Sequence, residues 1–229
     1  MNKFMLKTTV LAVVLILTTT ALTFAQYAPE GDFVVVPSGN GVEIQGYNGR
    51  GGAVNIPPTI GGRPVISIYE AFKNNTTITS ITIPNSVIEI MAGFENMTRL
   101  TSVTINSTDL QASTGAFRNC TALTSVTIGT GITEIANFMF QGCTALRNIT
   151  IPVSVTRISP NAFSGCTSLA TITILRESTG ANFTGTVLGN INAFNNTAAN
   201  LSIRVPANSV NAYKTATNWS THASKISGN

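Results

Sequence analysis

Residues 116–128 read AFRNCTALTSVTI, residues 139–151 read MFQGCTALRNITI, and residues 162–174 read AFSGCTSLATITI. The three phrases begin 23 residues apart, so Phe117, Phe140 and Phe163 keep one step and the cysteines keep the same step. Internal repetition with a period of about 20 to 50 residues is typical of a solenoid, in which each repeat forms one coil. The phrase therefore predicts a stack of coils rather than a single globular core.

The apolar residues of each repeat predict a parallel β-sheet. Counted from its Phe, a repeat carries apolar residues at positions +6, +9 and +11, and the last two have the period of a half-buried strand. Val54 and Ile56 supply an earlier strand in the same phase, so we expect about seven rungs. The sets are Phe72, Ile78, Ile81 and Ile83; Phe94, Leu100, Val103 and Ile105; Phe117, Leu123, Val126 and Ile128; Phe140, Leu146, Ile149 and Ile151; Phe163, Leu169, Ile172 and Ile174; and Phe194, Ile203 and Val205, where Asn200 breaks the pattern at +6.

Each coil is expected to turn after its strand and to cross a second wall. Proline lacks the amide hydrogen that would continue a ladder, so it stops a strand. A second apolar pair follows in most repeats, as in Val155 and Ile158, and predicts a short extended segment on the opposite wall. Four prolines directly follow the last strand residue: Pro57, Pro84, Pro152 and Pro206.

The most regular side chains are predicted to stack in the interior. A single coil cannot bury its own Phe, so six Phe rings should form a column, each burial contributing about 1.5–3 kcal/mol. Cys120, Cys143 and Cys166 share one repeat position, where Met97 stands in another copy. Side chains that point the same way in register are poorly placed for a disulfide. We therefore expect three free, buried thiols.

Residues 1–25 are predicted to be a signal peptide. Lys3 and Lys7 precede an apolar run, and the small Ala25 fits cleavage before Gln26. A retained membrane anchor is the alternative, but the apolar run is shorter than the roughly 20 residues of a membrane span, and no later stretch reaches that length. We expect an exported protein that is extracellular, on the cell surface or periplasmic, with no integral span in the mature chain.

The charge pattern argues against nucleic acid as a partner. Lys3 and Lys7 are two of thirteen basic residues against nine acidic ones, so their removal lowers the formal net charge from +4 to +2. Charged residues make up 10% of the chain and form no basic cluster. Nucleic-acid binding needs clustered Lys and Arg.

The ends and one long repeat depart from the pattern. We expect an N-terminal cap over residues 26–55, repeats over 56–205, and a C-terminal cap over 206–229, where Ser209 would cap a short helix through Thr215. Residues 174–205 form a repeat eight residues longer than the others. Insertions in solenoids map to surface loops, often on the binding face. The loop at 175–191 is thus a candidate binding loop or a neutral insertion; its candidate residues are Arg176, Glu177, Phe183 and Leu188.

The side chains between the buried strand positions are predicted to face solvent and form a hydroxyl-rich sheet face. Thr suits exposed strand positions in any protein, which is one interpretation. The other is a polar recognition surface that binds a protein or glycan partner through many weak hydrogen bonds. Its residues are Ser80, Thr82, Ser102, Thr104, Ser125, Thr127, Asn148, Thr150, Thr171, Thr173, Ser202 and Arg204.

These repeats resemble the BspA-like leucine-rich repeat family of bacterial surface proteins. The segment from Ile151-Pro152 through Val155, Ile158, Phe163 and Cys166 to Ile174 carries the resemblance, with entry and closing segments at 41–68 and 205–219. The resemblance implies a leucine-rich-repeat solenoid that is secreted or surface-exposed and in some members is an adhesin for host matrix or cells. It supplies no binding residues.

Catalytic chemistry has little support in the sequence. His222 is the one histidine, and we expect it to be solvated and inert in the C-terminal cap. Glu89 and Glu134 share a repeat position with Arg157 and predict a solvated charge row. The cysteines lack the Cys-x-x-Cys spacing of a metal site, and the Asn-x-Thr triplets, such as the one at Asn119, are interpreted as turns. No cofactor is expected.

The leading hypothesis is a non-enzymatic binding module. A structural or self-associating envelope protein is the alternative. An enzyme and an ice-binding solenoid rank third.

Overall fold

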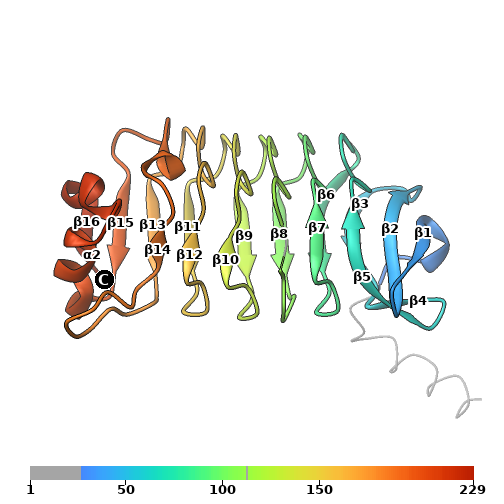
Figure 1. Cartoon of the computed structure of the whole chain (residues 1–229). Helices are drawn as coiled ribbons and strands as arrows, with labels where there is room; N and C mark the ends of the chain where they lie inside the picture. Colours follow the sequence, from blue (N-terminus) through green and yellow to red (C-terminus); the bar gives the residue numbers. More distant parts are fainter. Residues whose placement is uncertain (1–26, 112) are drawn as a thin grey trace, which may run out of the picture.

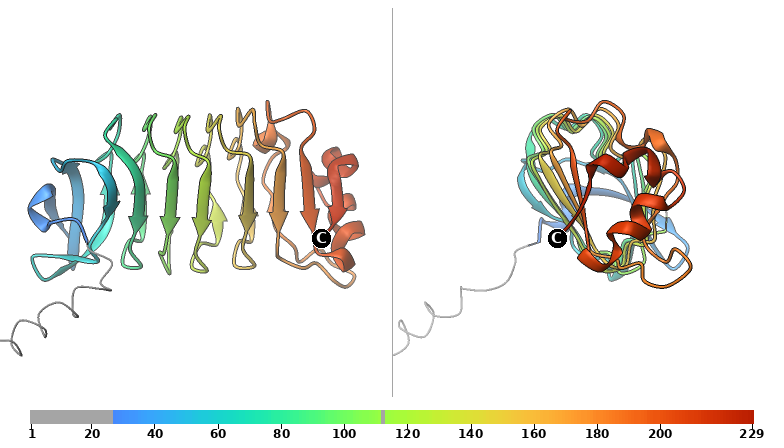
Figure 2. Two further views of the ribbon diagram at one scale, coloured as in Figure 1. Left: turned by 180° about the vertical axis from the view of Figure 1, so that it is seen from behind. Right: turned by 90° about the vertical axis from the view of Figure 1, so that its left-hand side faces the viewer.

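The computed structural model describes residues 27–111 and 113–229. The predicted signal peptide, residues 1–25, lies outside the described residues. The chain winds into coils that stack along one axis from the N-terminal to the C-terminal end, and the stack is nearly straight in both side views (Figures 1 and 2). The predicted solenoid is therefore confirmed, although its sheet face is close to flat along the stack.

One long side of the solenoid, the front wall, is built from parallel strands one coil apart. Their register follows the repeat, with Val54 opposite Ile81, Ile81 opposite Val103, and Ile149 opposite Ile172. The seven predicted rungs are all present, and a further strand from the C-terminus adds an eighth. The strands are β3 (Gly52–Asn55), β6 (Ile78–Ile83), β8 (Ser102–Ile105), β9 (Ser125–Ile128), β11 (Asn148–Ile151), β13 (Thr171–Ile174), β15 (Ser202–Val205) and β16 (Ile226–Gly228).

The ladder of the front wall is interrupted once. It runs in the order β3-β6-β8-β9, stops, and resumes as β11-β13-β15-β16. Val126 and Ile128 of β9 are only half-buried, whereas Ile149 and Ile151 of β11 are buried. The periodicity of the sequence continues through this step without a change, so the interruption was not predicted.

The opposite side, the back wall, carries the second apolar pairs of the repeats. Val87, Ile90, Ile135, Val155 and Ile158 are all buried there. In the repeat over residues 105–117, one of the two that lack the pair, Leu110 instead bridges to Ile132. The strands are β2 (Gly41–Tyr47), β5 (Arg63–Tyr69), β7 (Glu89–Met91), β10 (Glu134–Ile135), β12 (Arg157–Ile158) and β14 (Val187–Leu188).

The interior holds the predicted column of six Phe rings. From Phe72 through Phe94, Phe117, Phe140 and Phe163 to Phe194, successive ring centroids lie 5.0–6.0 Å apart with interplanar angles of 6–18°. Other aromatic rings close both ends. Phe33 and Tyr47 pack on Phe72 at the first end, and Trp219 and His222 pack on Phe194 at the last.

The turn after each Phe explains the Asn residues of the triplets. Asn74, Asn96 and Asn119 have φ between +57° and +62°, a left-handed conformation that Asn tolerates better than most residues. Gly142 and Gly165 take the same place in the next two coils at φ +72° and +76°, where glycine has no Cβ to strain. The side chain of Asn119 also donates to Asn96 at 3.0 Å. The triplets are thus turn residues, as predicted.

The cysteine column has free thiols, as predicted. Cys120, Cys143 and Cys166 are buried and unbridged. Each Sγ donates to a Phe carbonyl oxygen of the preceding coil, at 3.1, 3.2 and 3.0 Å. Burial raises the pKa of Cys120 and Cys166 to about 12, and that of Cys143 well above its ordinary value. These thiols pack and do not ionise near neutral pH.

Two different structures close the ends. At the N-terminal end, β1 (Phe33–Ser38) pairs antiparallel with β2, after η1 (Glu30–Asp32), and β4 (Thr59–Ile60) pairs with β5. At the C-terminal end, η3 (Ala207–Ser209), α2 (Val210–Thr215) and η4 (Trp219–Lys225) cover the last coil (Figure 2, right). Between residues 27 and 229, leaving out 112, no helix has the length and apolarity of a membrane span.

Candidate binding surfaces

The hydroxyl face is the outer surface of the front wall. Because side chains alternate along a strand, the residues between the buried positions point outward. The parallel register aligns them in two columns from β6 to β9 and in two columns from β11 to β15. All are half-buried or exposed, and Ser125, Thr127, Asn148 and Thr150 at the centre are exposed. The face comprises Ser80, Thr82, Ser102, Thr104, Ser125, Thr127, Asn148, Thr150, Thr171, Thr173, Ser202 and Arg204.

The hydroxyl face is a polar surface with little charge. Arg204, in the last coil, is the one ionised side chain among these residues, and it is exposed. Hydroxyl and amide groups both donate and accept hydrogen bonds, so the face can match a ligand of either polarity. Aromatic and Arg anchors usually dominate interface energy, and the face has one Arg and no aromatic residue. Its arrangement suits many weak contacts over a long surface.

A shallow groove crosses this face where the ladder is interrupted. It has a volume of about 350 Å³ and is lined by Val126, Thr127 and Ile128 of β9 and by Thr150, Pro152 and Leu175 of the next two coils. Pro152 has no amide hydrogen to donate toward β9. The groove breaks the hydroxyl columns at their centre and exposes apolar atoms there.

The candidate loop at 175–191 lies against the rest of the chain. Leu188 belongs to β14 of the back wall and is fully buried, so it is not a surface residue as we expected for this loop. Phe183 is half-buried, with its ring edge-on to Tyr213 at 5.0 Å. Arg176 donates to the carbonyl oxygens of Thr184 and Val153, both at 2.9 Å. Glu177 is exposed.

The C-terminal cap holds this loop in place. The Tyr213 hydroxyl donates to the Arg176 carbonyl and accepts from the Thr186 amide, both at 2.8 Å. The Trp219 indole donates to the Thr186 carbonyl at 2.7 Å. Ser209 occupies the N-cap position of α2, as predicted, but its hydroxyl makes no capping bond and instead accepts from the Ser178 amide at 2.9 Å. The inserted segment therefore packs against the C-terminal cap and is hydrogen-bonded to it at Arg176, Ser178 and Thr186.

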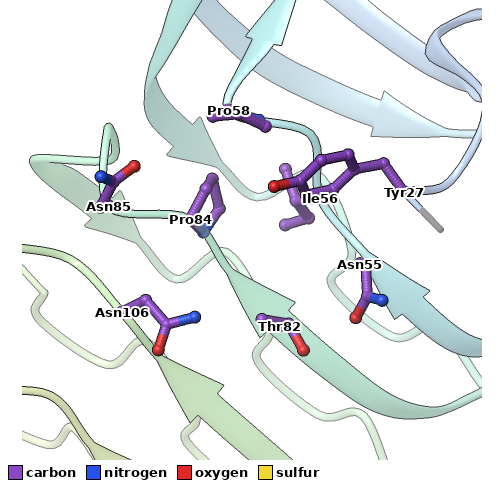
Figure 3. A pocket seen from close by; sticks show the side chains of 8 residues that line it. All are labelled: Tyr27, Asn55, Ile56, Pro58, Thr82, Pro84, Asn85 and Asn106. Carbon is purple, nitrogen blue, oxygen red and sulfur yellow. The ribbon is translucent and has the colours of Figure 1, made fainter. Parts of the chain in front are cut away.

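A polar pocket lies at the N-terminal end of the front wall, where the strands β3, β6 and β8 end (Figure 3). Its volume is about 580 Å³, within the usual range of ligand pockets. Asn55, Thr82, Asn85 and Asn106 supply amide and hydroxyl groups, and the Tyr27 side chain projects across it. Ile56, Pro58 and Pro84 form its apolar surface. Of these residues only Thr82 was a predicted site residue.

The sequence carries a partial signal for this pocket. Asn106 stands where other repeats have the strand-ending Pro84, Pro152 or Pro206. Asn85 follows Pro84, and Tyr27 lies 25 residues before β3 begins at Gly52. Tyr27 reaches the other pocket residues because the N-terminal segment lies against the end of β3, where the Ala28 amide binds the Asn55 carbonyl. The repeat pattern does not specify this contact.

The candidate catalytic groups do not assemble into a site. His222 is half-buried rather than solvated as predicted, because its ring packs edge-on against Phe194 at 5.3 Å. That burial lowers its pKa, and nearby Lys225 adds to the effect, while a hydrogen bond with the Ile191 backbone opposes it. Glu134 pairs with Arg157 at 3.8 Å and accepts a hydrogen bond from Ser159. The predicted charge row thus includes a paired carboxylate.

Comparison with known proteins identifies the repeats. The profile described as BspA type Leucine rich repeat region matches residues 67–183 in six copies. Among curated protein sequences, none matches this chain. The family comprises mainly protein-interaction modules, typically secreted or surface proteins of bacteria and typically without enzymatic activity.

Three solved bacterial leucine-rich repeat proteins share the fold. The leucine-rich repeat protein TpLRR of T. pallidum is 23% identical with a TM-score of 0.61, over 79% of this chain and 85% of that one. A protein from Bacteroides ovatus is 22% identical with a TM-score of 0.57, over 77% and 42%. One from Eubacterium ventriosum is 17% identical with a TM-score of 0.54, over 75% and 51%. At these identities the likeness concerns the fold alone.

Proposed function

Because the chain belongs to the BspA-type leucine-rich repeat family, we propose that it is an exported, non-enzymatic module that binds a protein partner through its hydroxyl face. The observation that carries the proposal is the array of solvent-facing Ser and Thr side chains, which is in register along β6, β8 and β9 and again along β11, β13 and β15. It offers a long, nearly uncharged surface with repeated hydrogen-bonding groups. Adhesion to host matrix or to cells is the role we infer for such a surface on an exported protein.

The location and division of the chain are part of this proposal. Residues 1–25 direct export and are removed, residues 26–55 and 206–229 close the ends, and residues 56–205 present the binding face. Sequencing the N-terminus of the protein recovered outside the cytoplasm tests the first point, with Gln26 as the expected first residue. A first residue at Met1 would contradict cleavage.

The hydroxyl face can be tested by adding charge at its centre. Thr127→Lys, Thr150→Lys and Thr173→Lys together place three ammonium groups on one column of the face. The matched control is Thr121→Lys, Thr133→Lys and Thr156→Lys, three exposed threonines that lie outside the face. Binding to a panel of purified matrix proteins and to intact cells is measured for both variants and the parent.

We expect the face variant to lose at least about tenfold in affinity, equivalent to 1.4 kcal/mol, and the control to keep the parent affinity. Equal binding by both variants would exclude the face. The exposed part of the 175–191 loop, around Glu177, would then be the next candidate surface.

Self-association is the second candidate function, favoured by the groove between β9 and β11, which exposes apolar atoms in the middle of the face. Light scattering over a range of concentrations separates the two. A monomer at all concentrations would agree with a hydroxyl face that binds a different protein. An oligomer that forms with increasing concentration and is abolished in the face variant would favour self-association.

A further inference from the structure

We propose that the pocket at the N-terminal end of the front wall, around Tyr27, Asn85 and Asn106, binds a neutral saccharide. The inference goes beyond the proposed protein-binding function, because only Thr82 belongs to both the pocket and the hydroxyl face. It assigns a ligand class to a separate site that opens at the rim of that face (Figure 3).

The pocket residues are held in place by the backbone. The Ala28 amide donates to the Asn55 carbonyl at 2.9 Å, which fixes Tyr27 beside the end of β3. The Asn106 amide donates to the Ile83 carbonyl at 3.0 Å. These bonds use main-chain groups and leave the side chains pointing toward the pocket (Figure 3). A site whose shape exists before the ligand arrives avoids the entropy cost of ordering it.

The polar groups of the pocket suit hydroxyl groups. A carboxamide offers two donors and one acceptor oxygen, so Asn85 and Asn106 can each bond adjacent hydroxyls of opposite polarity. Both residues are exposed, and within the described chain neither side chain is engaged in an intramolecular hydrogen bond. Thr82 adds a hydroxyl that can donate or accept. Each sugar hydroxyl both donates and accepts, so it can use the donors and the acceptors of these side chains. A ligand with acceptors alone would leave the carboxamide oxygens without a partner.

The apolar part of the pocket suits the carbon face of a sugar ring. Tyr27 is 52% exposed, so a large part of its ring is open to a ligand. An aromatic ring offers a flat apolar surface with a polar hydroxyl tip. Pro58 and Pro84 add further apolar surface around it. A pyranose has the same two-sided character, with C–H groups on one face and hydroxyls around the edge.

The charge of the lining decides against other ligand classes. The described residues that line the pocket are Tyr, Asn, Ile, Pro and Thr, and none of them is ionised. Phosphate, sulfate and carboxylate ligands are bound most strongly by charge-assisted hydrogen bonds from Arg or Lys. Protein partners are usually anchored by aromatic or Arg side chains in desolvated apolar pockets, and this pocket is open and rich in amides.

A second uncharged pocket, of about 460 Å³, lies at the C-terminal end and is lined by Asn182, Phe183, Thr215 and Thr217 among others, but its aromatic ring is half-buried against Tyr213, whereas that of Tyr27 is exposed. At the place of Asn106, the later coils carry Gly129, Pro152 and Leu175. Two of these line the groove of the front wall, which has neither an amide nor an aromatic group. The groove therefore provides an internal comparison within the same fold: a hollow of similar position in the coil that lacks the proposed chemistry.

The test uses the purified protein and defined probes. An array presents uncharged oligosaccharides of hexoses and N-acetylhexosamines, the same chains carrying sialic acid or sulfate, and a set of uncharged peptides. Titration calorimetry with the strongest neutral oligosaccharide then compares the parent with Tyr27→Ala and with the double variant Asn85→Ala, Asn106→Ala. The matched controls are Tyr69→Ala, which removes another exposed Tyr, and Asn200→Ala, which removes another exposed Asn.

We expect binding to neutral oligosaccharides, a loss of at least about tenfold in affinity in both pocket variants, and parent affinity in both controls. Thermal melts should be alike, because the changed side chains are exposed. Binding to charged glycans or peptides alone, no binding to neutral sugars, or equal affinity of pocket and control variants would overturn the assignment. The face variant of the preceding section should keep its sugar affinity, so failure here is distinguishable from failure of the protein-binding proposal.

Discussion

The two ends of the solenoid use aromatic residues in opposite ways. At the C-terminal end, Tyr213 and Trp219 are fully buried and bind the backbone of the inserted segment through their polar tips. At the N-terminal end, Tyr27 is about half exposed and crosses an open pocket. Aromatic side chains are therefore part of the core at the C-terminal end, whereas at the N-terminal end one of them is open to solvent.

The comparison teaches that an irregular repeat is a weak guide to function in this fold. The long repeat deviates most in sequence, yet its extra residues are largely occupied in holding the cap. The N-terminal coils keep a nearly regular step and nevertheless bring together a pocket. A single substitution at a regular position, Asn106 in place of the strand-ending Pro, is a better signal for the pocket than the length of a repeat.

The sharpest test of the comparison is to truncate one aromatic residue at each end. Trp219→Ala should lower the free energy of unfolding by about 3–5 kcal/mol, because a fully buried ring is removed and a cavity remains. Tyr27→Ala should change it by less than about 0.5 kcal/mol, as expected for an exposed residue. Chemical denaturation of both variants measures the difference, and equal losses would remove the contrast between the ends.

A smaller effect is expected from a single oxygen atom. Tyr213→Phe keeps the ring but leaves the buried Thr186 amide without its acceptor and the Arg176 carbonyl without a donor. The cost should be about 1–3 kcal/mol. Tyr69→Phe, at an exposed position, is the control and should be neutral. A neutral Tyr213→Phe would mean that the loop does not depend on the cap.

The stability of the C-terminal end should also respond to pH. Burial against Phe194 lowers the pKa of His222 below 6.5, with Lys225 adding to the shift. The unfolded chain therefore binds a proton more readily than the folded chain, so stability should fall as the pH drops below about 6.5. Denaturation between pH 8 and pH 5 measures this. His222→Gln should flatten the dependence in that window, and an unchanged slope would assign it to other groups.

The smallest expected effect belongs to the pocket amides. Asn106→Ala and Asn200→Ala both remove exposed amides, and each should change stability by less than about 0.5 kcal/mol. The two variants should differ only in sugar affinity. A loss of stability at Asn106 alone would reveal a structural role for its side chain in the turn after β8.

The interior was predictable because it repeats. Phe, Cys and Leu recur at one step, so their stacking follows from the condition that each coil must be covered by the next. The Asn turns were predictable for a related reason, since Asn119 and its equivalents occupy a left-handed conformation in every coil. Such features need only the period and the properties of single residues.

The features that escaped prediction depend on contacts between distant or non-equivalent residues. Leu188 pairs with Ile158 of the back wall, and the inserted residues before it pack against the C-terminal cap. The Ser209 hydroxyl binds the Ser178 amide instead of an amide of α2, and the His222 ring is covered by the ring of Phe194. The pocket needs Tyr27 to return beside β3. Neither the spacing of the repeats nor the residue types in the sequence specify these contacts.

The interruption between β9 and β11 has a mechanical consequence. Most neighbouring coils are joined by a ladder on the front wall, but this step relies on the back wall, where β10 pairs with β12, and on the turn and ring contacts between them. Tension along the stack will therefore separate the coils first on the front side of this step, with the back wall acting as the hinge. A solenoid pulled at its two ends would yield at its middle, with its closed ends still intact.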